Sequence, residues 1–208
     1  MLCVIDYGIG NVGSIINMVS HVGGSAHLID DPENLKGCSG FILPGVGRFS
    51  EAMHLLDRDG WIKPLTRLAL EEKVPVLGIC LGMQLMTKSS EESPGVNGLG
   101  WFNASTHRIQ LPSESALKIP HMGWNSIVPT PGSFFDTEVS PQRLYFVHSY
   151  KVVCENEYDV AAVTDFGRPF TSAIESGNLV GIQAHPEKSH RHGMRIIRKF
   201  LRQCGQLC

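Results

Sequence analysis

Residues 76–84 read VLGICLGMQ, an apolar run that ends at Cys80 with a glycine two positions away on either side. The run predicts a buried strand, and the residues after it predict the start of a helix. At so sharp a turn, side chains at Gly78 or Gly82 would collide with the neighbouring strand or helix. The G-x-C-x-G pattern is typical of a nucleophile elbow with cysteine in place of serine. A core cysteine beside a tight turn would give the same pattern.

Working outward from this segment, short apolar runs alternate with helical patterns through the first half of the chain. Strands are predicted at residues 2–5, 26–29, 40–43 and 74–80, and helices at residues 11–21, 50–57, 62–72 and 83–88. Wholly apolar strands that alternate with helices predict a parallel sheet covered on both faces.

After about residue 90 the pattern changes to successive strands with turns between them. These strands are predicted at residues 101–111, 124–128, 145–153, 158–164, 172–175 and 180–184, and a basic amphipathic helix at residues 190–203. Ser176-Gly177-Asn178 is a hairpin signal between the last two strands. We therefore expect one α/β domain over residues 1–208, with a mixed, mostly parallel central sheet flanked by helices and a β-rich second half.

The composition narrows the class of partner. The 208 residues are 42% hydrophobic and 18% charged, as in ordinary globular proteins. Eighteen Lys and Arg against 20 Asp and Glu leave no basic excess for a phosphate backbone, which argues against nucleic acid. No apolar stretch reaches the roughly 18 residues of a membrane span. Scattered cysteines and a start without a secretory signal predict a cytoplasmic protein with reduced thiols.

Two further segments could complete a site around Cys80. His185-Pro186-Glu187 follows a strand and would supply a base and the carboxylate that orients it, although a surface turn is the alternative. Pro44-Gly45-Val46-Gly47 follows the third strand, where backbone N–H groups could form an oxyanion hole. A plain glycine-rich turn would also fit this second segment. At the elbow itself, the helix N-terminus would favour a thiolate.

Together these segments resemble the class I, triad-type glutamine amidotransferases, over essentially the whole chain. Further stretches narrow the resemblance to the glutaminase subunits of imidazole glycerol phosphate synthase: DYGIGN at residues 6–11, PGVGRF at 44–49, HMGWN at 121–125, YFVHSY at 145–150 and HPEKS at 185–189. The resemblance implies the flavodoxin-like fold of that class and no metal or other cofactor. It also implies hydrolysis of glutamine to glutamate and ammonia, which passes to a separate (β/α)₈ cyclase subunit in a heterodimer.

The resemblance also implies roles for individual residues. Cys80 would attack the carboxamide of glutamine, and His185, partnered by Glu187, would protonate the leaving ammonia. The remaining roles follow from motif position: the oxyanion would be held at Gly45, Val46 and Leu81, glutamine at Gly47, Gln84, Glu92, His148, Ser149 and Tyr150, and the cyclase at Asn11, Trp124 and Lys188. Because Glu91 stands beside Glu92, the match at that position is ambiguous. We expect the 45–47 loop to be misaligned until the partner binds.

Other interpretations remain open. A paralogous glutaminase could feed ammonia to a partner that amidinates a surface sugar, and a non-catalytic scaffold or another cysteine hydrolase could use the same elbow. Residues 8–13 fit the dinucleotide pattern G-x-G-x-x-G, although no other segment suggests a nicotinamide pocket. His185, His190 and His192 invite a metal site, but the last two are only two positions apart on the predicted helix and would face different directions.

Overall fold

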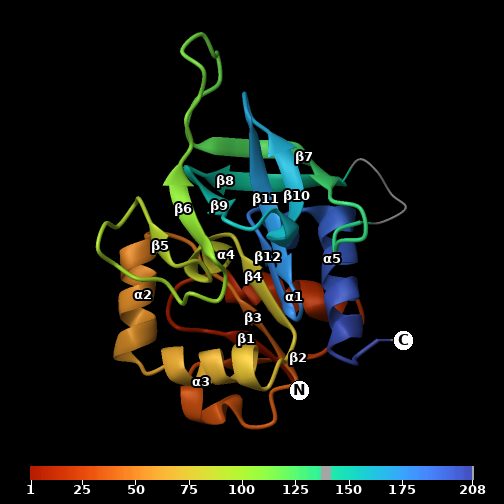
Figure 1. Cartoon of the computed structure of the whole chain (residues 1–208). Helices are drawn as coiled ribbons and strands as arrows, with labels where there is room; N and C mark the ends of the chain where they lie inside the picture. The colour runs from red at the N-terminus through yellow and green to blue at the C-terminus, as the bar shows by residue number, and fades with distance from the viewer. Residues whose placement is uncertain (137–141, 208) are drawn as a thin grey trace.

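The computed structural model of the chain describes residues 1–136 and 142–207 (Figure 1). The strands are β1 (Leu2–Ile5), β2 (Ala26–Ile29), β3 (Gly40–Leu43), β4 (Val76–Ile79), β5 (Ser89–Ser90), β6 (Ala104–Arg108), β7 (His121–Pro129), β8 (Gln142–His148), β9 (Tyr150–Cys154), β10 (Val160–Asp165), β11 (Pro169–Ser176) and β12 (Leu179–Ile182). The helices are α1 (Val12–His21), α2 (Phe49–Arg58), α3 (Ile62–Thr66), α4 (Leu81–Leu85) and α5 (His190–Gln203). Short 3₁₀ or π turns occur at η1 (Pro32–Leu35), η2 (Arg67–Glu71), η3 (Glu157–Asp159) and η4 (Pro186–Lys188).

A single sheet runs through the molecule in the order β2-β1-β3-β4-β12-β11-β10-β7-β8. The strands from β2 to β12 are all parallel, and from β12 onward each strand runs antiparallel to its neighbour. A side branch of β9, β6 and β5 joins at β11. The prediction of one α/β domain with a mixed, mostly parallel central sheet flanked by helices is confirmed.

Alternating side chains of the parallel strands point to opposite faces of the sheet, and each face has its own helices. Leu2 and Val4 of β1 face a core that includes residues of α1 and α5. Cys3 and Ile5 face a second core that includes residues of α2 and α3. Figure 1 shows these two helix pairs on opposite sides of the sheet. Because helices pack on both faces of the sheet, the parallel strands are held in place, and so are their ends, on which the site is built.

Some predicted elements have different bounds. The helix predicted from residue 83 begins at Leu81, directly after the elbow, and ends at Leu85. The predicted helix 62–72 continues beyond Thr66 as the π turn η2. The predicted strand 145–153 is two strands, because β8 pairs with β7 up to His148 whereas β9 pairs with β6 and β11 from Tyr150. Ser149 therefore lies where the chain changes partners.

Candidate active site

Cys80 lies at the turn between β4 and α4. Its backbone has φ 53° and ψ −109°, a left-handed conformation that is costly for a residue with a side chain. A Cβ at Gly78 would come within 2.5 Å of the Met86 sulfur, and one at Gly82 would overlap the carbonyl oxygen of Leu43 on β3. The steric reason inferred for the two glycines is thus present, and the turn has the geometry of a nucleophile elbow.

His185 and Glu187 follow β12, the strand beside β4. The two side chains are each only 2% exposed, and His185 Nδ1 lies 2.7 Å from Glu187 Oε1. The backbone N–H of His185 donates to the carbonyl of Tyr145. His185 Nε2 is buried and forms no well-aligned hydrogen bond with any described residue. The alternative of an exposed His-Pro-Glu turn is therefore wrong.

The charge state of His185 depends on the same neighbours. Burial by itself lowers the pKa of the ring, but the neighbouring Cys80 sulfur and the hydrogen-bonded Glu187 carboxylate outweigh burial and raise the pKa to about 10. An imidazolium between a thiolate and a carboxylate is stabilised by both. The ring of His185 can therefore carry a proton at neutral pH beside Cys80 and Glu187.

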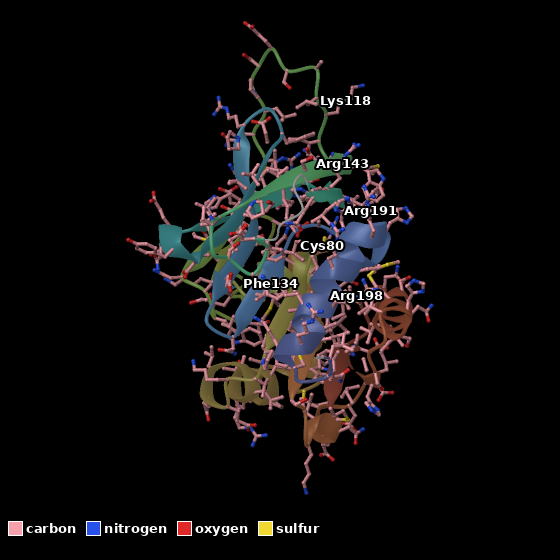
Figure 2. All side chains as sticks on the ribbon, turned by 90° about the vertical axis from the view of Figure 1, so that its right-hand side faces the viewer. Cys80, Lys118, Phe134, Arg143, Arg191 and Arg198 are labelled. Carbon is pink, nitrogen blue, oxygen red and sulfur yellow. The ribbon has the colours of Figure 1, made fainter. Side chains whose placement is uncertain are left out.

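A cavity of about 320 Å³ opens above these groups. Its wall contains most of the residues that the sequence assigned to catalysis and glutamine binding: Val46, Gly47, Cys80, Leu81, Gln84, Glu92, His148, Ser149, Tyr150 and His185. Pro120 and Val147 also line it and were not anticipated. The cavity has the size for an amino acid, and Cys80 lies in its wall. Figure 2 shows Cys80 in the interior, behind the outer face of α5 that carries Arg191 and Arg198.

The structure separates Glu91 from Glu92. Glu92 lines the cavity, and its Oε2 accepts a hydrogen bond from the backbone N–H of Phe49 at 2.9 Å. Glu91 instead pairs with His107 at 2.7 Å and lines a different hollow. Only Glu92 is placed where it could contact a ligand beside Cys80.

The glycine loop after β3 lies against the elbow. The backbone N–H of Leu81 donates to the carbonyl oxygen of Gly45 at 3.3 Å. Because a trans peptide points its C=O and the following N–H in opposite directions, the N–H of Val46 points away from this position. The Gly45 carbonyl oxygen thus accepts the hydrogen bond of the Leu81 N–H, and the Val46 N–H does not join Leu81 as a second donor.

Asn11, Trp124 and Lys188 lie outside the cavity. Asn11 is exposed at the N-cap of α1. Trp124 is 40% exposed and contacts Tyr145 edge-on at 6.1 Å, and Lys188 Nζ lies 5.7 Å from the centre of the same Tyr145 ring. Since the Tyr145 carbonyl also accepts from the His185 backbone N–H, Trp124 and Lys188 form a surface directly beside His185.

No role was predicted for Gln183, which is fully buried directly after β12. Its Nε2 donates to Cys80 Sγ at 3.6 Å, and its Oε1 accepts from Gln84 Nε2 at 2.9 Å. The one feature of the sequence that could have pointed to Gln183 is its place as a polar residue directly after the apolar run at residues 179–182.

The dinucleotide and metal interpretations gain no support from the geometry. The loop at residues 8–13 packs on the glycine loop, since a Cβ at Gly10 would lie 3.2 Å from the ring carbons of Pro44. His190 stacks on Trp124 at 5.4 Å, whereas His192 is buried and His185 pairs with Glu187. Within residues 1–136 and 142–207, no three His, Cys, Asp or Glu side chains are placed to hold a metal ion. In the same part of the chain, none of the helices combines the length and apolar character that crossing a bilayer requires.

Comparison with known proteins gives a consistent result. Residues 3–204 match the family model of class-I glutamine amidotransferases. A Methanococcus maripaludis protein named imidazole glycerol phosphate synthase subunit HisH 2 is 44% identical, covering 98% of this chain and 100% of its own. The HisH subunit of that synthase from Sulfurimonas denitrificans is 40% identical over 96% of this chain and 97% of its own.

Solved structures of lower identity share the fold. A crystal structure described as a glutamine amidotransferase has a TM-score of 0.77 at 18% identity, with 98% of both chains covered. A chain of PurLQS from Thermotoga maritima has a TM-score of 0.72 at 17% identity, with 97% of both chains covered.

Proposed function

The chain belongs to the class-I glutamine amidotransferases, within the HisH glutaminase subunits of imidazole glycerol phosphate synthase, and on that premise we propose how its residues hydrolyse glutamine to glutamate and ammonia. The observation that carries the proposal is the buried His185–Glu187 pair beside Cys80 in the wall of one amino-acid-sized cavity. We take the amidotransferase domain to span residues 1–208.

In the first step, the Cys80 thiolate attacks the carboxamide carbon of glutamine and forms a C–S bond, while the C=O electron pair moves to oxygen. His185 then transfers its Nε2 proton to the amide nitrogen, the C–N bond breaks and ammonia leaves. The product is a glutamyl thioester on Cys80. Water cleaves it in the second step, giving up its proton to His185 and releasing glutamate.

The negative oxygen of each tetrahedral intermediate needs two N–H donors, for which we propose Leu81 and Val46. In the structure the backbone N–H of Leu81 donates instead to the Gly45 carbonyl oxygen. Rotation of the Gly45–Val46 peptide by about half a turn would remove that oxygen and bring the Val46 N–H in. We assign Gly47, Gln84, Glu92, His148, Ser149 and Tyr150 to the binding of glutamine, supported by their place in the cavity wall.

We further propose that a cyclase subunit forms a heterodimer with this chain and favours the rotated peptide. Hydrolysis without an acceptor would waste glutamine, and ammonia released into water would be protonated. The surface of Trp124 and Lys188 beside His185 suits such a contact, and we assign Asn11, exposed at the N-cap of α1, to the same contact. Free thiols at Cys3, Cys38, Cys80, Cys154 and Cys204 favour a reducing compartment, for which we propose the cytoplasm.

The test is Cys80→Ala in the complex with the cyclase. We expect synthesis of imidazole glycerol phosphate from glutamine to be abolished and synthesis from added ammonium salt to be retained, because the cyclase chemistry lies in the partner. Cys154→Ala, a half-buried thiol on β9, is the matched control and should leave both activities intact. Loss of both activities in the Cys80 variant would instead assign the residue to the fold.

The acceptor is tested separately. The chain should restore growth of a histidine auxotroph that lacks its own glutaminase subunit. If the unaltered chain is well expressed and does not restore growth, the result would favour the paralogous function, in which the ammonia is used to amidinate a surface sugar.

A further inference from the structure

The segment HMGWN contains a buried imidazole that the mechanism above does not use. On β7, Met122 and Trp124 are exposed, whereas His121 is 3% exposed and faces inward. Its ring lies between Phe146 at 4.7 Å and Phe166 at 4.1 Å, stacked on both. A polar ring in so apolar a site must have its nitrogens satisfied.

The hydrogen bonds around His121 determine which ring nitrogens carry a proton. His148 Nδ1 lies 2.8 Å from the carbonyl oxygen of Tyr150, and because a carbonyl only accepts, that nitrogen must donate. In a neutral ring His148 Nε2 is then an acceptor, so His121 Nδ1, 2.9 Å away, must donate to it. His121 Nε2 in turn accepts from Asn125 Nδ2 at 3.2 Å.

The amide of Asn125 is itself fixed. Its Nδ2 also donates to the carbonyl of Asp165 at 2.8 Å, and its Oδ1 accepts from the N–H of Ser126. Asn125, His121 and His148 therefore form a chain in which each donor has a matching acceptor, provided that both rings are neutral.

Both rings are neutral near pH 7. Burial lowers the pKa of His121 to about 4. Burial also lowers the pKa of His148, to about 3, with smaller effects of the nearby rings of His121 and His185 in the same direction and an opposing effect of the Tyr150 carbonyl. No carboxylate is among the groups that shift the pKa values of these two rings, and Asp165 bonds to Asn125 through its backbone carbonyl.

The carbonyl of Tyr150 joins this chain to the nucleophile. It also accepts from Gln84 Nε2 at 3.4 Å, and Gln84 Nε2 donates in addition to Gln183 Oε1 at 2.9 Å. Gln183 Nε2 then donates to Cys80 Sγ at 3.6 Å. A continuous hydrogen-bonded chain thus runs from Asn125 on β7 to the sulfur.

We propose that His121 is a positioning residue for glutamine hydrolysis, which fixes the tautomer of His148. The hydrogen-bonded chain then holds the Tyr150 carbonyl and the Gln84 amide in place and keeps Gln183 Nε2 against the Cys80 sulfur. His121 contacts neither substrate nor reacting atoms. Without it, His148 Nε2 is buried without a donor and the ring is free to turn from Tyr150, so the wall that binds glutamine shifts. This inference rests on the proposed function of the cavity.

Three variants in the complex with the cyclase test the proposal. His121→Leu removes the donor to His148, and we expect kcat/KM for glutamine to fall about tenfold, mainly through KM, the effect of one positioning hydrogen bond. His121→Asn keeps an N–H near the place of Nδ1 and should restore most of the loss. Phe166→Leu removes a ring stacked on His121 but no hydrogen bond, and should leave kcat/KM close to that of the unaltered chain. Synthesis from ammonium salt should be unchanged in all three.

A direct measurement on the unaltered chain does not depend on any variant folding. In ¹⁵N NMR spectra of histidine-labelled protein at pH 7, His148 should be protonated on Nδ1 alone and His121 on Nδ1 alone. A proton on His148 Nε2 would overturn the proposal, and so would equal losses in His121→Leu and Phe166→Leu. Normal glutamine hydrolysis by His121→Leu would overturn this inference only, whereas no glutamine hydrolysis by the unaltered complex would overturn the proposed function beneath it.

Discussion

Glu187 interacts with His185 through one carboxylate oxygen, while its other oxygen is buried without a hydrogen bond from the described residues. A buried carboxylate of this kind is stabilised chiefly by the charge that its partner acquires. Its contribution to catalysis should therefore be electrostatic: it keeps the imidazole protonated until the proton is transferred to the leaving nitrogen.

Glu187→Gln tests that role. The amide keeps the shape and an acceptor for Nδ1 but removes the charge that helps to raise the pKa of His185 to about 10. We expect kcat/KM for glutamine to fall about 100-fold or more, and the alkaline limb of its pH profile to move to lower pH. Glu91→Gln is the matched control, because Glu91 pairs with His107 at the same 2.7 Å on another surface. A similar loss in both variants would contradict the assignment.

At the scale of residues, the sequence was sufficient to predict that Cys80, His185 and Glu187 come together, because each stands in a short motif directly after a strand. It was not sufficient for Gln183 or His121. Their hydrogen bonds are to residues 103 and 27 positions away, Cys80 and His148, and no local pattern encodes such a distance.

At the scale of elements, the site depends on β3, β4 and β12 being neighbours in the sheet. The carboxyl ends of adjacent parallel strands bring the glycine loop, the elbow and the His-Pro-Glu turn to one edge. All three strands could be predicted from apolar runs. The break between β8 and β9 could not, because the residues around Ser149 have the same alternation on both sides while the strand that they pair with changes.

Gly82→Ala should test how tightly the elbow packs on β3. The added methyl group would overlap the Leu43 carbonyl, which belongs to a central strand and cannot move cheaply. We expect a loss of about 1–3 kcal/mol in the free energy of unfolding, measured by urea denaturation. Gly13→Ala in α1, where the structure leaves open space, should be neutral or slightly stabilising. Equal stability of the two variants would show that the elbow tolerates a side chain.

At the scale of the whole molecule, the buried histidines give stability opposite dependences on pH. His121 and His148 have folded pKa values of about 4 and about 3, below the usual 6.5, so their contribution is present above pH 6.5 and is lost as pH falls. His185, raised to about 10, contributes below pH 6.5, and its contribution is lost as pH rises toward 10. Each group changes stability by about 1.4 kcal/mol per pH unit within its window.

We therefore expect the free energy of unfolding to be greatest near pH 6.5 and to fall on both sides. Urea denaturation at intervals from pH 4 to pH 10 measures this directly. The His121→Asn variant should lose stability less steeply between pH 6.5 and pH 4, because one of the two histidines is absent. A flat profile over that interval would contradict the burial of neutral rings.

The Gly45 carbonyl at the Leu81 N–H has a consequence for how the resting chain would meet different reagents. It obstructs only reactions that build charge on an oxygen atom, and it leaves the sulfur and its imidazole in place. When the Cys80 sulfur displaces the halide ion from an alkyl halide, no negative charge builds up on an oxygen atom. An alkyl halide should therefore modify Cys80 at much the same rate with or without the cyclase. The resting conformation of the loop therefore hinders reaction with the amide substrate and leaves the reactivity of the Cys80 sulfur unchanged.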